Sequence, residues 1–291
     1  MSKIKYPVAR SHPTIHACPQ FRPIRRGARR KGLERIYTCG NGDKLTISLF
    51  WELDIADQDL LLCLLAIARA ESRGVIIPVA PETISGKVLR VGLDLQGYAA
   101  TQEALMISVS RFELLTELGR SSDSRSYLWL KNSLIRLSKV SFVRDSQTDK
   151  YFWTFNLLSV SSIAEQINIA INPLSARAVL GHQDGYVLQH RAERASLDSE
   201  EARALHSVLC GLVQPNTYKV INTDVISDRV YARYDDVITD RAQRGRRAAV
   251  KSAAAQINKL DGWACDSIGR GKDSSLSITR NYRDNRDKVS G

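Results

Sequence analysis

The sequence predicts an α+β fold in which two successive units each contain helices followed by a β-hairpin. In the first half, helical patterns up to Leu137 precede alternating strand patterns over 140–144 and 151–158. In the second half, a helical pattern over Thr239–Leu260 precedes strand patterns over 263–268 and 276–280. Helix, turn, helix and hairpin is the element order of a winged helix-turn-helix. We therefore expect two winged helix-turn-helix domains in tandem.

Charge is distributed unevenly over the 291 residues, whose net charge is +11. Residues 1–35 hold ten Lys and Arg against Glu34 alone, together with four prolines that disfavour regular structure. This stretch is predicted to be a basic, flexible and disordered arm. Residues 36–165 are predicted to form the first winged-helix domain and residues 166–283 the second. Residues 284–291 are predicted to be a polar tail.

Capping signals mark where several helices should begin. Ser110 opens a capping box with Glu113, and Asn172 precedes a proline at the first helical position. Asp198 is expected to open a helix over Glu200–Val213, and Thr223 a short helix to about Tyr231. The sequence CGNGD within 36–49 predicts a hairpin turn, because Asn-Gly accepts positive φ.

The stretch TDRAQRGRRAAVKSAAAQINKL, Thr239–Leu260, carries six basic residues and one acid. At about 100° per residue, its cations and its apolar side chains occupy two separate arcs of roughly 120° each. Arg246 is the exception, because it falls on the apolar edge near Val250. The apolar arc lacks Trp and Phe, which disfavours a membrane-surface helix. A solvated face remains an alternative, but few acids are present to pair with the cations, so contact with nucleic acid is favoured.

In a winged helix-turn-helix, the second helix enters the major groove and the hairpin wing lies against the DNA backbone. In the second domain, Thr239–Leu260 corresponds to that helix and the turn GRGKDSS corresponds to the wing tip. The second domain is therefore predicted to be the main DNA reader. Arginine suits the two acceptors that guanine presents in the major groove. The first unit offers a thinner set of cations, for which phosphate contact and a structural role stay open. The predicted DNA-binding residues are Arg241, Arg244, Arg246, Arg247, Lys251, Arg270, Lys272, Arg125, Lys131, Arg25, Arg26, Arg29 and Arg30.

Several function classes are disfavoured by missing motifs. There is no phosphate-binding loop G-x-x-x-x-G-K-[ST] and no H-x-H pair of a rolling-circle nickase, so we expect no enzymatic activity and no cofactor. The cluster of His12, His16 and Cys18 lacks a fourth ligand, so no metal site is expected. Five cysteines without a CxxC pair fit a reducing compartment. With no signal peptide and no long apolar run, we expect a cytoplasmic bacterial protein that binds no membrane.

Particular segments resemble the RepC-type replication initiators of IncQ-like mobilisable plasmids. The most specific are INPLSARAVLG (171–181) and SLDSEEARALHSVLCGL (196–212). Similar segments, in the same order, are CPQFRPIRRGARR (18–30), IRLSKVSF (135–142), LLS (157–159), GW (262–263) and SITR (277–280). The basic run RGRRAAVK (244–251) also matches the family, whereas the sequence departs from it between Tyr218 and Asp240.

The resemblance implies a non-catalytic initiator that binds directly repeated sites, called iterons, in double-stranded origin DNA. It also implies opening of an adjacent A+T-rich region, so that a plasmid-encoded replicative helicase is loaded, and it leaves a homodimer possible. The alternative is a winged-helix transcriptional repressor acting on its own operon. Both functions use the same DNA-binding chemistry, and the residues alone do not separate them.

Overall fold

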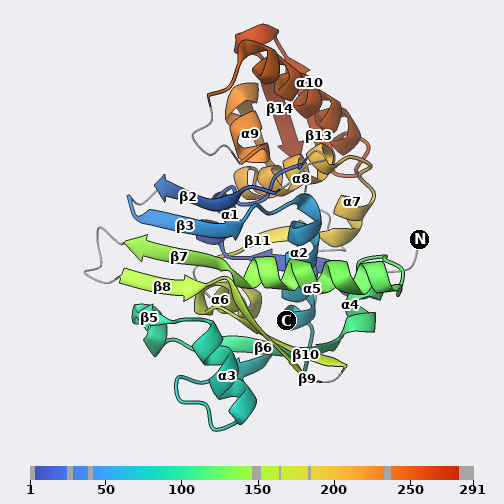
Figure 1. Cartoon of the computed structure of the whole chain (residues 1–291). Coiled ribbons are helices and arrows are strands. Elements are labelled where there is room, and N and C mark those ends of the chain that lie inside the picture. Colours follow the sequence, from blue (N-terminus) through green and yellow to red (C-terminus); the bar gives the residue numbers. More distant parts are fainter. Residues whose placement is uncertain are drawn as a thin grey trace. The chain divides into compact units, whose positions relative to one another are not determined.

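The computed structural model describes residues 4–24, 29–38, 42–145, 152–163, 165–182, 185–232 and 237–281 (Figure 1). The chain divides into two compact units, each with its own core. The first unit takes residues 1–20 and 24–191, and the second takes residues 21–23 and 192–291. The predicted polar tail, 284–291, and two predicted DNA-binding residues, Arg25 and Arg26, lie outside the described residues.

The first unit contains most of the strands. In chain order its elements are β1 (Val8–Ser11), α1 (Pro13–Ala17), β2 (Lys31–Thr38), β3 (Lys44–Trp51), α2 (Ile55–Arg69), β4 (Val75–Ile77), α3 (Ile84–Gly92), β5 (Gln96–Gly97), η1 (Tyr98–Thr101), β6 (Ala104–Ser110), α4 (Arg111–Glu117), α5 (Ser124–Ser138), β7 (Val140–Asp145), β8 (Phe152–Asn156), β9 (Leu158–Ile163), β10 (Gln166–Ile171), α6 (Pro173–Leu180) and β11 (Val187–His190).

Three antiparallel sheets organise this unit. Their strand orders are β2-β3-β7-β8-β5, β4-β6-β10-β9 and β1-β11. In the five-stranded sheet, Ile47, Phe142 and Phe155 are register partners in one row and are almost fully buried. The rings of Phe142 and Phe155 stack with centroids 5.2 Å apart. One face of this sheet therefore belongs to the core of the unit.

Helix α2 lies in the interior of the first unit. Every residue from Leu60 to Ala68 is buried, which is the pattern of a helix covered on all sides. Asp54 caps its first turn by accepting from the Asp57 amide at 2.8 Å, and the Asp57 carboxylate accepts from the Asp54 amide in return. The leucine-rich sequence with a reciprocal cap thus forms a central helix that packs against β1, β6 and the helices of the same unit.

The N-terminal segment is ordered where the structure describes it, which differs from the flexible arm expected for residues 1–35. β1 pairs with β11, and the side chains of Tyr6, Val8, Ala9 and Ile15 are buried. Pro13 does not prevent regular structure here, because it occupies the first turn of α1, where its missing N–H has no helical partner. Burial of the apolar residues between the prolines outweighs the charge of the segment.

The boundary between the units also differs from the expected one at residue 165. β10 pairs with both β6 and β9, and α6 follows it within the first unit. β10 and β6 are far apart in the sequence, so no local sequence pattern predicts that they pair. The main part of the second unit therefore begins at residue 192, within α7 (Arg191–Ala195).

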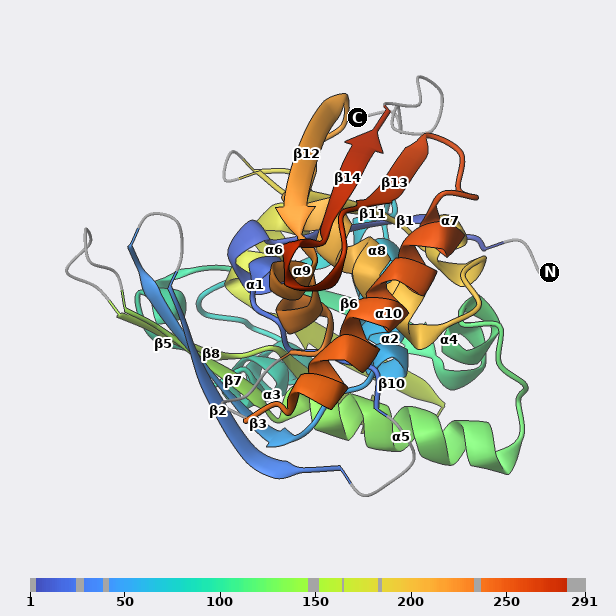
Figure 2. The ribbon, with the colours of Figure 1, turned by 90° about the horizontal axis from the view of Figure 1, so that it is seen from above.

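The second unit is smaller. Its further elements are α8 (Glu200–Leu212), β12 (Thr217–Asn222), α9 (Thr223–Val230), α10 (Asp240–Ile257), β13 (Trp263–Ile268), η2 (Gly271–Asp273) and β14 (Ser275–Arg280). Figure 2 shows β12, β14 and β13 side by side in that order, with α9 and α10 on one side of the sheet. From α8 onward, the unit thus has the element order helix, strand, helix, helix and β-hairpin.

The helix starts follow the sequence signals, with two corrections. Asn172 accepts from the Ser175 amide at 3.0 Å, as expected. Ser110 accepts from the Glu113 amide at 3.0 Å, but the expected capping box is only half formed, because the Glu113 carboxylate binds Arg73 instead. The cap of α8 is Ser199 rather than Asp198. The cap of α9 is Asn222 rather than Thr223, whose backbone is already helical. Each correction moves the cap by one residue, because neighbouring polar side chains compete for the same amides.

Among the described residues, no helix combines the length and the apolar character required to cross a membrane. In the same part of the chain, no three His, Cys, Asp or Glu side chains form a group that could hold a metal ion.

Candidate nucleic-acid interface

Helix α10 is fixed to the second unit by a narrow apolar stripe. Val250, Ala253, Ala254 and Ile257 are buried, and they face α8 and α9. Burying side chains such as Val250 and Ile257 contributes about 1.5–3 kcal/mol each. The apolar arc expected from the sequence is therefore the face that packs on the unit.

Polar side chains fix the C-terminal half of α10. Gln256 accepts from the Asp198 amide at 3.0 Å and donates to Ser199 Oγ at 3.1 Å, which joins α10 to the start of α8. Asn258 accepts from the Cys265 amide and donates to Asp266 Oδ1 at 3.1 Å, which joins it to β13. At the other end, Thr239 caps the helix by accepting from the Ala242 amide at 3.2 Å. The helix is held along its length.

Two of the predicted cations on α10 point into solvent. Arg241 and Arg244 are exposed and lie in its first two turns, one turn apart, whereas Lys251 is half-buried farther along the helix. Between these cations, the exposed residues Gly245 and Ala248 are small. The N-terminal half of α10 thus presents two long cationic side chains, and the small side chains next to them leave the helix backbone accessible.

Arg247 is placed differently from the expectation that it joins the solvent-facing cations, whereas Arg246 lies toward the apolar side of the helix as its position in the sequence indicates. The Arg247 guanidinium forms two hydrogen bonds of 2.6 Å with the Asp224 carboxylate on α9, and its side chain is 12% exposed. The Arg246 guanidinium lies over the Tyr231 ring, 4.9 Å from its centroid. Both side chains are therefore turned toward α9. The physical reason is that the Asp224 carboxylate on α9 and the Tyr231 ring directly after it lie within contact distance of the two guanidiniums.

The turn between β13 and β14 carries the two other predicted cations of this unit. Arg270 and Lys272 are both exposed. The turn is attached to the start of α9, because Asn222 donates to the Lys272 carbonyl at 3.2 Å and the Thr223 amide donates to the Ser274 carbonyl at 2.9 Å. The hairpin tip, the start of α9 and the first half of α10 are therefore joined by polar contacts.

Beneath this surface, a buried polar cluster joins α7, α8 and the sheet. His206 Nε2 lies 3.1 Å from Glu193 Oε2, which also accepts from Trp263 Nε1 at 3.2 Å. Burial disfavours the charged imidazole, but the neighbouring Cys210 sulfur and Glu193 carboxylate favour it and raise the pKa of His206 to about 9. The Arg280 guanidinium lies over the Trp263 ring at 5.0 Å. The cluster is enclosed, so it supports the unit and is not exposed to a substrate.

In the first unit, α5 presents the exposed side chains of Arg125 and Lys131. The opposite side of this helix is anchored by Asp57, which accepts from Ser133 Oγ at 2.5 Å and from Arg136 Nη2 at 2.6 Å. Asp57 is fully buried at the start of α2. The two predicted residues therefore stand on a helix that is fixed to the core of the unit.

The two described arginines of the predicted arm are paired with acids of the same unit. Arg29 donates to the Glu52 carbonyl at 2.7 Å and forms ion pairs with Asp54 and Asp57. Arg30 forms an ion pair with Glu52 at 3.0 Å. These guanidiniums already have carboxylate partners, which differs from cations on a mobile arm. Their role in DNA binding stays a prediction.

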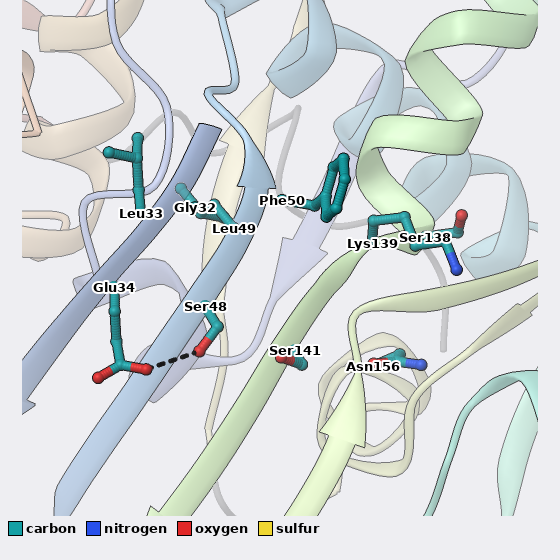
Figure 3. Close-up of a pocket in the computed structure, with 10 residues that line it drawn as sticks. All are labelled: Gly32, Leu33, Glu34, Ser48, Leu49, Phe50, Ser138, Lys139, Ser141 and Asn156. Carbon is teal, nitrogen blue, oxygen red and sulfur yellow. Dashed lines mark hydrogen bonds between the residues drawn. The ribbon is translucent and has the colours of Figure 1, made fainter. Parts of the chain in front are cut away.

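A groove of about 430 Å³ lies on the outer face of the five-stranded sheet (Figure 3). Its floor contains one polar row of register partners across four strands, namely Glu34, Ser48, Ser141 and Asn156. Ser48 Oγ donates to Glu34 Oε2 at 3.2 Å. Lys139 is the one cation among the lining residues. With a carboxylate opposing a single ammonium, this groove is a poorer match for a polyanion than the surface around α10.

Sequence reasoning did not find Asp224. It lies in the stretch that departs from the resembled family, and a single acid carries no motif. Its importance follows from a contact with a residue 23 positions away. Only the pairing of α9 with α10 reveals that contact.

The model of one protein family, replication protein C (RepC), matches residues 4–280. A search of curated protein sequences gave no significant match. Among solved structures, the Pi initiator protein in complex with iteron DNA is similar with a TM-score of 0.55 and 11% identity, covering 97% of this chain and 100% of that one. Domains 2 and 3 of RctB are similar with a TM-score of 0.50 and 10% identity, covering 93% of this chain and 99% of that one. At these identities, the structural likeness concerns the fold.

Proposed function

This chain belongs to the replication protein C (RepC) family, and from that premise we propose that it initiates plasmid replication by binding iterons in origin DNA. The observation that carries the proposal is the anchored helix α10, with Arg241 and Arg244 exposed on its first two turns. The likeness to an initiator bound to iteron DNA supports it.

In this proposal, each unit contains a winged helix-turn-helix. Within the second unit, α9 and α10 correspond to its two helices, and β13 with β14 corresponds to the wing (Figure 2). Within the first unit, α4 and α5 correspond to the helices and β7 with β8 to the wing. The second helix of such a motif enters the major groove with its N-terminal residues facing the bases. This assignment rests on element order and strand pairing.

Arg241 and Arg244 are the proposed base readers, since they are exposed on the N-terminal half of α10. Arg270 and Lys272, on the wing, are proposed to contact phosphates, as are Arg125 and Lys131 on α5. Lys251 is proposed to contact the backbone from the side of α10. Arg247 and Arg246, which are turned toward α9, are no longer proposed as base readers.

Further steps follow from the family. Iteron binding is proposed to promote opening of an adjacent A+T-rich region, onto which a plasmid-encoded helicase is loaded, and a homodimer is a possible inactive form. We propose that the protein itself is not an enzyme and that it acts in the bacterial cytoplasm, where the origin DNA is found. Repression of its own operon is the alternative outcome of the first experiment.

The first experiment is a footprint on the DNA that neighbours the gene. Protection of repeated direct sites beside an A+T-rich segment supports initiation. A single protected palindrome contradicts the proposal and favours a repressor. The protected duplex and a scrambled duplex of equal composition then serve as probes for the variants.

The second experiment separates base readers from phosphate contacts. Loss of an Arg–guanine contact costs about 1–3 kcal/mol of discrimination. Arg244→Ala should therefore lower the ratio of affinities for protected and scrambled duplexes about tenfold. Lys272→Ala should weaken both duplexes similarly and reduce the salt slope by about one unit.

Lys259→Ala is the control, because Lys259 is an exposed cation just beyond the C-terminal end of α10. It should change neither the affinity ratio nor the salt slope to the same extent. If Arg244→Ala and Lys272→Ala act equally on both duplexes, α10 contacts only backbone and the assignment of base reading fails.

A further inference from the structure

Asp224 is an acid within the most cationic surface of the second unit. It lies on the first turn of α9, and its side chain is 32% exposed. Its carboxylate accepts from Arg247 Nε and Nη2 at 2.6 Å each and from Gln243 Nε2 at 2.8 Å. Gln243 and Arg247 are four residues apart on α10, so one carboxylate holds two side chains of the same helix face.

The surrounding charges favour the ionised carboxylate. Hydrogen bonds from Arg247 hold the pKa of Asp224 below its usual value despite partial desolvation, and Gln243 and Lys272 act in the same direction. Asp240 is the second acid that acts on Arg247. The pairing is bidentate, which is the strongest geometry between a guanidinium and a carboxylate. A phosphate group offers Arg247 the same geometry.

The inference rests on the proposed function, because it concerns how α10 engages DNA. We propose that Asp224 is a specificity-determining positioning residue. Its carboxylate binds the Arg247 guanidinium in place of a phosphate, and so prevents Arg247 from binding the backbone of DNA of any sequence. The affinity of α10 then depends on Arg241 and Arg244, which are exposed. Cations that grip phosphates add affinity without sequence choice. Withholding one of them therefore favours the correct site over random DNA.

A merely structural role for Asp224 predicts a different result. If the ion pair only joins α9 to α10, its loss loosens α10 and weakens binding to every duplex. If Asp224 withholds Arg247, its neutralisation strengthens binding to random DNA. The two roles therefore change the affinity for scrambled DNA in opposite directions.

The variant Asp224→Asn removes the charge and keeps one acceptor oxygen. On the scrambled duplex, one additional phosphate contact should make the salt slope steeper by about 0.9, which corresponds to an affinity gain of about eightfold at 0.1 M salt. On the protected duplex the gain should be smaller, because base contacts fix the position of α10 and Arg247 cannot follow the nearest phosphate freely. The affinity ratio should therefore fall.

Three further variants complete the experiment. Arg247→Ala alone leaves the Asp224 carboxylate without its cation, so it should not make the salt slope on scrambled DNA steeper. Asp224→Asn combined with Arg247→Ala should lose the gain, which makes a double-mutant cycle. Asp224→Glu, which can pair with Arg247, should behave like the original protein. Asp198→Asn removes the same charge from an exposed position of the same unit and should not change the salt slope by a full contact.

The outcomes separate the inference from the function on which it rests. If the original protein binds neither duplex, the proposed function fails. If it binds but Asp224→Asn gives an unchanged or weaker interaction with scrambled DNA, or if the gain survives in the double variant, the role of Asp224 is refuted. A lowered unfolding midpoint together with weaker binding to both duplexes would identify Asp224 as a structural tie only.

Discussion

Replacing Glu117 with alanine tests whether the N-terminal segment is part of the folded first unit. Glu117 Oε2 accepts from Arg191 Nη1 at 3.1 Å, and Oε1 accepts from the Lys5 amide at 3.2 Å. Arg191 also donates to the Tyr6 carbonyl at 2.7 Å. The side chains of Arg191 and Glu117 are 6% and 7% exposed. A single ion pair therefore joins the N-terminal segment, α4 and the end of β11.

The expected cost follows from the burial of this pair. Removing one partner leaves a guanidinium enclosed without its carboxylate, which costs about 3–5 kcal/mol. Glu113→Ala is the comparison for the effect of burial on the same helix, since the Glu113 carboxylate also contacts the N-terminal segment by accepting from the Tyr6 hydroxyl at 3.1 Å. Its ion pair with Arg73 has the shorter contact, 2.8 Å, but both side chains are about a quarter exposed. A pair of that kind contributes about 1 kcal/mol or less.

The assay is urea unfolding combined with hydrogen exchange of the β1 amides. Glu117→Ala should lower the free energy of unfolding by several times the loss in Glu113→Ala. Exchange at Ala9 and Ser11, whose amides face β11 in the antiparallel register, should accelerate. A loss below about 1 kcal/mol for Glu117→Ala would refute the argument from burial. If β1 amides of the original protein exchange as fast as those of an unstructured chain, the segment is a flexible arm after all.

Two other predictions concern the buried cluster and the absence of catalysis. Because the folded-state pKa of His206 is raised to about 9 from 6.5, its charged form stabilises the fold fully below pH 6.5, and that contribution is lost as the pH rises through 9. The lowered pKa of Cys210 opposes this contribution to stability, so the test is an NMR titration of the folded protein. The His206 imidazole should stay charged well above pH 6.5, and titration at or below pH 6.5 would contradict the raised pKa. The purified protein should not nick supercoiled DNA that carries the protected sites, whereas Mg²⁺-dependent nicking that co-purifies with it would show an enzyme.

Local structure was largely predictable because its causes lie within a few residues. The caps at Ser110 and Asn172 follow from a polar side chain three residues before the amide that it binds. The hairpin of β13 and β14 was predicted within one residue, because alternating strands flank a turn rich in glycine. Gly181 ends α6 with φ of +78°, where glycine is favoured.

The family was also readable from the sequence, and the match over residues 4–280 confirms it. A family pattern of this kind follows the order of residues along the chain, so it requires no knowledge of which segments meet in space. The amphipathic arc of α10 was likewise linear, and Val250, Ala253 and Ile257 are buried as it predicted. For α10, both the buried face and the start of the helix follow from residues within the segment itself.

Only the tertiary structure decided which side chains meet. Arg247 had the position of a DNA contact on its helix, yet it pairs with Asp224 on another helix. The N-terminal segment had the composition of an arm, yet Arg191 and Glu117, 74 residues apart, hold it in place. Periodicity fixes the direction of a side chain relative to its own helix, but the partner on the next element is set by long-range packing. The sequence by itself therefore determined the family, several helix starts, the β13–β14 hairpin and the cationic helix. The structure decided that the N-terminal segment is folded and which cations remain available to a ligand.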